Sequence, residues 1–129
     1  MQALALYNKV LAVDPSDPVA LAGAGWIEWT IGFDAHRPSI VTIGRQEVEK
    51  AVKVSPTYSQ AHLYMGLILE NQDDNSSGAV TQFNQFLADD PSTQEVQQVA
   101  PQVDGAYLAA GVPIPAVLKI PTTTSTSAP

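Results

Sequence analysis

The chain has 129 residues, which suits one domain with one hydrophobic core. Six Lys and Arg against 13 Asp and Glu give a net charge of -7, so nucleic acids and anionic membrane surfaces are excluded as expected partners. The chain contains no cysteine, which excludes disulfides and thiolate chemistry. Its longest uncharged apolar run, residues 19–27, is far shorter than the roughly 20 residues of a membrane-spanning helix, so no membrane insertion is expected.

The first predicted element is a helix over residues 2–13, closed by a proline that cannot continue it. A second helix is predicted from Pro18 to about Ile31, since Asp17 is a good N-cap and proline suits the first helical position. Residues 30–43 then form an insertion. Its run Ile40-Val-Thr-Ile43 either extends the third helix backward or forms a short strand.

The third helix is predicted to end near Val54, the fourth to span residues 59–70 and the fifth residues 78–88. Ser92-Thr-Gln-Glu95 is a capping box that opens a sixth helix, and Pro101 is expected to kink it. Residues 112–120 are predicted to be extended and to pack on the last helices through Ile114, Val117 and Leu118. Residues 121–129 form a Thr/Ser/Pro-rich tail typical of linkers.

A repeated pattern relates the first, third and fifth helices. The positions that recur with the spacing small-x3-large-x2-apolar-x4-Pro are Ala3, Tyr7, Val10 and Pro15; Gly44, Val48, Ala51 and Pro56; and Ala79, Phe83, Phe86 and Pro91. The second and fourth helices share a small-x3-apolar-Gly pattern that ends at Gly25 and Gly66. We expect these two glycines to lie at close helix crossings.

These residues resemble the tetratricopeptide repeat, a pair of antiparallel helices of about 34 residues. The resemblance implies an all-α, right-handed solenoid of about two and a half repeats over residues 1–110, with a C-terminal capping helix, followed by an extended segment and tail over residues 111–129. The first helix has no preceding partner, so we expect that the natural chain extends upstream of Met1.

Catalytic signals are weak. The sequence contains no phosphate-binding loop, no nucleophile elbow and no His-x3-His pair, so it indicates neither an enzyme nor a metal or other cofactor. We interpret His62 as a packed, hydrogen-bonded side chain and His36 as part of a solvated loop. The adjacent pairs Asp73-Asp74 and Asp89-Asp90 are interpreted as solvated or helix-end polar groups.

The resemblance implies a binding groove lined by the first helix of each pair. The main residues predicted to line it are Val19, Trp26, Trp29, Leu63, Tyr64 and Leu67; Thr30 and Asn71 are also expected to face it. Such an apolar, aromatic surface suits a protein or peptide partner; the alternative is that a terminal helix or the extended segment of residues 112–120 fills the groove in this chain. The acidic neighbours Glu28 and Glu70 favour a basic amphipathic ligand.

Residues 56–110 also resemble the C-terminal repeat domain of actinobacterial membrane-anchored proteins related to cytochrome c biogenesis factors. That resemblance implies an extracytoplasmic interaction module of a longer anchored or exported protein, with a cytoplasmic location as the alternative. A second hypothesis for function is a structural subunit that self-associates, because the unpaired first helix exposes apolar surface.

Overall fold

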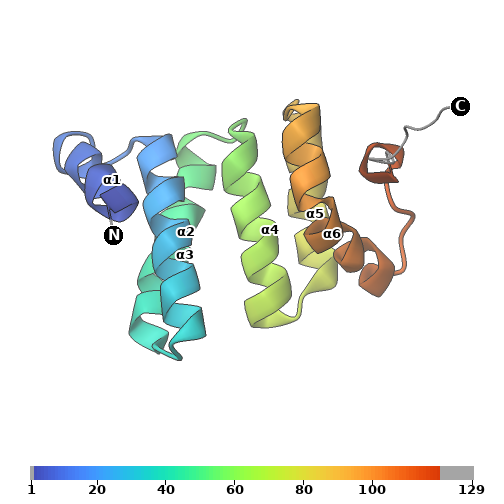
Figure 1. Cartoon of the computed structure of the whole chain (residues 1–129), viewed down its shortest axis with the longest axis horizontal. Coiled ribbons are helices and arrows are strands. Elements are labelled where there is room, and N and C mark those ends of the chain that lie inside the picture. The colour runs from blue at the N-terminus through green and yellow to red at the C-terminus, as the bar shows by residue number, and fades with distance from the viewer. Residues whose placement is uncertain (1, 120–129) are drawn as a thin grey trace, which may run out of the picture.

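The computed structural model describes residues 2–119, which form six helices packed mostly in the order of the chain (Figure 1). The helices are α1 (Gln2–Val13), α2 (Pro18–Asp34), α3 (Pro38–Val54), α4 (Ser59–Asp73), α5 (Ser76–Ala88) and α6 (Thr93–Ala110), followed by a short 3-10 helix η1 (Ala116–Lys119). The all-α prediction is confirmed. None of the helices within residues 2–119 combines the length and the apolar character that crossing a membrane requires. The predicted tail of residues 121–129 lies outside the described residues.

The predicted helix starts are confirmed at two caps. The Asp17 carboxylate accepts a hydrogen bond of 2.9 Å from the backbone N–H of Ala20 and so caps α2. At α6, the Ser92 hydroxyl accepts from the Glu95 N–H at 3.1 Å, and the Glu95 carboxylate accepts from the Ser92 N–H at 3.0 Å. Two otherwise unpaired donors are thereby satisfied at the start of α6.

The insertion of residues 30–43 is helical almost throughout, so the strand alternative is wrong. Its first part adds a turn to α2, its last part begins α3 at Pro38, and a short turn at residues 35–37 joins them. His36 adopts a left-handed backbone conformation in this turn, with φ of 54°, and is exposed as predicted. Helix is favoured because Val41 packs in a buried cluster with Trp29 and Val48, a contact that one helical face permits.

Small residues allow the paired helices to pack closely against each other, as the sequence predicts. A Cβ atom added at Gly25 would lie 2.7 Å from the backbone oxygen of Gly44, so α2 and α3 touch backbone to backbone. A Cβ at Gly66 would collide with the ring of Phe83, which therefore packs directly against the α4 backbone. Side chains larger than hydrogen would force these crossings apart.

The core is layered between successive helices. The largest cluster lies among α4, α5, α6 and η1 and includes Phe83, Phe86, Val103, Tyr107 and Leu118. Two smaller clusters lie among α2, α3 and α4; one contains Trp29, Val41, Val48, Met65 and Ile68, and the other Leu21, Ala22, Ala51 and Ala61. Helix α1 buries no residue fully and lies at one end of the row (Figure 1).

The C-terminal part of the molecule differs from its prediction in two respects. Helix α6 contains Pro101 and changes direction partway along its length, as expected where a proline removes an internal hydrogen bond (Figure 1). The following segment is extended only to residue 115, because residues 116–119 form η1. Leu118 is buried and Ile114 packs beside it, whereas Val117 is exposed and makes no part of the core.

Candidate binding groove between α2, α4 and α6

A cavity of about 580 Å³ lies between α2, α4 and α6. Its lining combines aromatic, apolar and polar side chains: Trp26, Trp29, Thr30, Phe33, Asp34, Leu67, Glu70, Asn71 and Gln102. Two further cavities are smaller, about 340 Å³ beside α1 and α3 and about 360 Å³ at the α2–α3 turn. We refer to the 580 Å³ cavity as the groove.

Four aromatic rings form one continuous stack along a wall of the groove. The ring centroids of Tyr64 and Trp26 are 4.8 Å apart, those of Trp26 and Trp29 are 5.4 Å apart, and those of Trp29 and Phe33 are 4.7 Å apart. The planes of neighbouring rings differ by 3°, 13° and 22°. Trp26 stacks with both Tyr64 and Trp29, so part of its ring surface is covered by these neighbours. The rings of this wall are therefore in place before a ligand binds, and their planes are nearly parallel.

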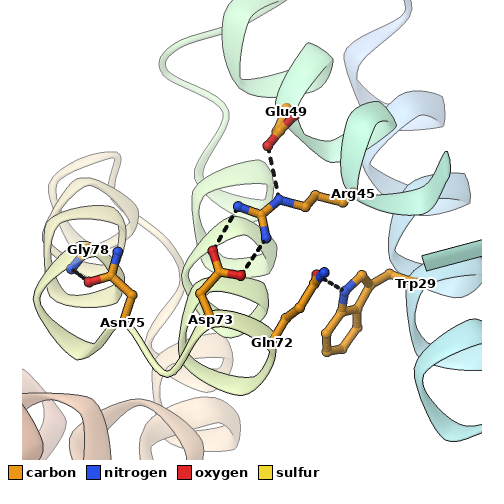
Figure 2. Close-up of polar contacts among 7 residues, drawn as sticks. All are labelled: Trp29, Arg45, Glu49, Gln72, Asp73, Asn75 and Gly78. Atoms are coloured by element: carbon orange, nitrogen blue, oxygen red, sulfur yellow. Dashed lines mark hydrogen bonds and ion pairs between the residues drawn. The ribbon is translucent and has the colours of Figure 1, made fainter. Parts of the chain in front are cut away.

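Polar contacts hold this wall against the C-terminal part of α4 (Figure 2). The indole N–H of Trp29 donates a 3.0 Å hydrogen bond to the Gln72 side-chain oxygen. Arg45 of α3 donates two hydrogen bonds, of 3.0 and 2.9 Å, to the two carboxylate oxygens of Asp73, and a third of 3.1 Å to Glu49. These contacts join the α2–α3 pair to α4. The α2 side and the α4 side of the groove are therefore held in a fixed position relative to each other.

The polar groups of the groove are mostly hydrogen-bond acceptors. The side-chain N–H of Asn71 donates to the Leu67 backbone oxygen at 2.7 Å, which leaves the Asn71 amide oxygen free to accept. The Thr30 hydroxyl donates to the Ile27 oxygen at 2.9 Å and keeps only acceptor capacity, whereas the Asn71 amide also retains one N–H. Burial, with a contribution from the charge of Asp74, raises the pKa of Glu70.

The structure brings together four of the six predicted groove residues. Trp26, Trp29 and Leu67 line the cavity, and Tyr64 ends the aromatic stack beside them. Trp29 is only 4% exposed, so it supports the wall more than it offers surface. Leu63 is buried in the α4–α5–α6 core, and Val19 is 50% exposed without lining the cavity.

Three lining residues escape the sequence prediction. Phe33 and Asp34 lie on the extra turn of α2, and Phe33 follows Trp29 by four residues, a spacing that would reveal it once the helix is extended. Gln102 reaches the groove from α6, immediately after Pro101. Nothing in the sequence indicates that a polar residue beside a proline faces a groove.

The prediction that Glu28 flanks the groove is not supported, because Glu28 faces Glu47 across the α2–α3 pair. One Glu47 carboxylate oxygen is buried without a hydrogen-bond donor among the described residues. Burial, followed by the hydrogen bond and charge of Glu28, raises the pKa of Glu47 to about 8. A proton on Glu47 lets the two carboxyl groups share a hydrogen bond. Of the two acidic residues expected at the groove, only Glu70 lines it.

The interpretation of His62 as a packed side chain is confirmed. Its Nε2 lies 2.6 Å from the Pro56 backbone oxygen and its Nδ1 lies 2.8 Å from the Gln82 side-chain oxygen. Asp89 is not solvated, because its side chain is 8% exposed and one oxygen lies 3.9 Å from the His62 Nε2. Within residues 2–119, no group of three or more His, Asp or Glu side chains is placed to hold a metal ion.

Comparison with known proteins adds no relative: no family model, no curated protein and no solved structure matches this chain.

Proposed function

We propose that this protein is a non-enzymatic interaction module that binds a peptide or a partner helix in the groove between α2, α4 and α6. The observation that carries the proposal is the preformed aromatic stack beside a cavity of about 580 Å³. A rigid aromatic wall loses little conformational freedom when a ligand binds, and Trp and Tyr side chains dominate many interfaces. Polar acceptors around the cavity would fix the orientation of the bound segment.

The repeated sequence pattern supports the same proposal at the level of architecture. The pairs α2–α3 and α4–α5 carry the matching glycine and proline positions, and a scaffold of tetratricopeptide type would use its inner helices for binding. By the resemblance of residues 56–110, we propose a role in assembling an envelope complex or in cytochrome c biogenesis, on the extracytoplasmic side of a bacterial envelope.

Selection of peptides from a displayed random library on the immobilised protein tests the proposal. The tightest peptides are then titrated against wild-type protein and against Phe33→Ala, which removes the most exposed ring of the stack. Loss of an interfacial anchor of this kind costs about 1–2 kcal/mol, so we expect affinity to fall about tenfold.

Ile31→Ala is the matched control, because Ile31 lies on the same helix and is 39% exposed, against 37% for Phe33, but does not line the groove. The control variant is expected to bind like the wild type. Equal affinity for all three proteins would refute the groove as the binding site.

A second candidate function is a structural subunit that assembles through α1. One face of α1 is apolar and exposed, with Leu6, Val10 and Val13 open to solvent. The residues equivalent to Val10, Ala51 in α3 and Phe86 in α5, are fully buried. This candidate predicts concentration-dependent association in sedimentation velocity.

Leu6→Glu would abolish that association if α1 is the contact. Leu108→Glu, at a position 70% exposed against 61% for Leu6, would leave it unchanged. A monomer at every concentration would exclude the assembly role for this segment.

A further inference from the structure

The acidic end of the groove suggests the chemistry of its ligand. We propose that the groove takes a basic side chain of the bound peptide, with arginine favoured, and holds its charged group between Asp34 and Glu70. This inference rests on the proposed binding function and adds the identity of the anchoring residue.

Two helix ends of the same polarity meet at this place. Helices α2 and α4 run in the same direction, so their C-terminal ends lie on the same side of the row, at the bottom in Figure 1. The C-terminal end of a helix carries partial negative charge from its unpaired carbonyl groups. Neither helix has a basic residue in its last turn. The field at this end of the groove therefore attracts a cation.

The two carboxylates are placed where that field disfavours them. Asp34 is the last residue of α2, and Glu70 lies in the last turns of α4. Asp73, by contrast, is neutralised by Arg45. Within residues 2–119, neither Asp34 nor Glu70 forms an ion pair, and no Lys, Arg or His lines the groove. A cation from a ligand would compensate both carboxylates and both helix ends.

The aromatic stack decides how the basic side chain would lie. A cation is attracted to the face of an aromatic ring, whereas the ring edge carries partial positive charge. Trp26 stacks with both Tyr64 and Trp29, which leaves less of its ring faces open to a cation. The alkyl stem of the ligand side chain would therefore pack along the ring edges, and its charged group would reach the carboxylates beyond them.

Arginine fits the acceptors better than lysine does. Besides the two carboxylates, the amide oxygen of Asn71 and the hydroxyl oxygen of Thr30 keep acceptor capacity at the groove. Guanidinium presents five N–H donors in a planar fork, against three on an ammonium group. Several separate acceptors are thus satisfied at once by one guanidinium.

The test uses the tightest library-selected peptide, measured by calorimetry beside a copy in which each arginine is replaced by citrulline. Citrulline keeps the size and planarity of arginine but carries no charge. We expect the citrulline peptide to bind about tenfold more weakly or worse, because charge-assisted hydrogen bonds are lost. A lysine-for-arginine copy is expected to bind with intermediate affinity.

Variants of the protein locate the effect. Asp34→Asn and Glu70→Gln should each reduce affinity for the arginine peptide and leave affinity for the citrulline peptide almost unchanged. Asp14→Asn removes the same charge at the α1–α2 connection, away from the groove lining, and should not distinguish the two peptides.

The outcomes separate this inference from the function on which it rests. If Phe33→Ala weakens binding but selected peptides lack basic residues, or citrulline replaces arginine without loss, the groove binds peptides and the basic anchor is refuted. If Phe33→Ala has no effect, the groove is refuted as the binding site, and the proposed function fails with it. Loss of affinity in Asp34→Asn, Glu70→Gln and Asp14→Asn alike would indicate long-range charge attraction and would also overturn the assigned site.

Discussion

At the scale of single residues, the α2–α3 crossing leaves no room for a side chain at Gly25. The atom that a new Cβ would meet is the Gly44 backbone oxygen, which moves only if the whole helix moves. We predict that Gly25→Ala destabilises the protein, because overpacking costs about 1–3 kcal/mol and exceeds the helix-propensity gain of about 1 kcal/mol. Urea unfolding measures the difference.

Gly105 provides the control, since a Cβ there meets nothing within 4 Å. Gly105→Ala should raise stability by up to about 1 kcal/mol through helix propensity alone. If Gly25→Ala is as stable as Gly105→Ala, α2 and α3 do not cross at Gly25.

The Glu28–Glu47 pair predicts a dependence of stability on pH. Below pH 4.5 the Glu47 carboxyl is neutral in both states; between pH 4.5 and about 8 it ionises in the unfolded chain while the folded protein keeps its proton. The folded state then binds more protons, so stability falls as pH rises and the loss is complete above about pH 8.

Glu47→Gln should remove this dependence of stability on pH, and the glutamine amide should donate a permanent hydrogen bond to Glu28. Denaturation measured from pH 4.5 to pH 9 should show a flatter profile for this variant and higher stability than wild type at the alkaline end. Asp104→Asn, which removes one charge on α6, should keep the wild-type slope of stability against pH. A wild-type slope in Glu47→Gln would contradict the shared proton.

At the scale of the helix, the end of α2 carries an acidic residue where the helix dipole favours a basic one. Asp34→Asn should therefore stabilise the unliganded protein by about 0.3–1 kcal/mol while weakening the binding of a basic peptide. Replacing a residue whose role is to bind a ligand is expected to have opposite effects on stability and on binding. Thermal melts with and without peptide measure both; an Asp34→Asn protein that is less stable than wild type would contradict the argument.

The start of α6 is a second test at this scale. Ser92→Ala removes one half of the capping box and should cost about 1 kcal/mol, because the Glu95 N–H loses its acceptor. Thr93→Ala, at the next and exposed position, should have little effect. Equal unfolding midpoints for the two variants would show that the cap contributes nothing to stability.

The helices were predictable because their signals are local. Proline positions, the Asp17 cap and the Ser92 capping box act within one or two turns, and the structure places helix starts there. The boundaries at residue 34 and residue 73 were not predictable, since α2 and α4 are prolonged by contacts between distant residues. The Trp29–Gln72 hydrogen bond and the Arg45–Asp73 pair join positions 43 and 28 residues apart.

At the scale of the whole molecule, the groove depends on three helices far apart in the chain. Sequence spacing identified Trp26, Tyr64 and Leu67, because they repeat on equivalent helices. It placed Leu63 in the groove wrongly, because Leu63 is buried in the core with α5 and α6. Which face α4 presents to helices further along the chain depends on the angles between the helices. Gln102 is brought to the groove by α6, which no repeat position marks.

In the proposed function, the protein binds its partner on the face between α2, α4 and α6. Amide chemical shifts of the ¹⁵N-labelled protein, recorded during titration with the tightest selected peptide, test it most directly. We expect the largest changes at Phe33, Glu70 and Gln102, one from each helix, and small changes along α1. Changes concentrated on α1, with these three residues unaffected, would contradict it.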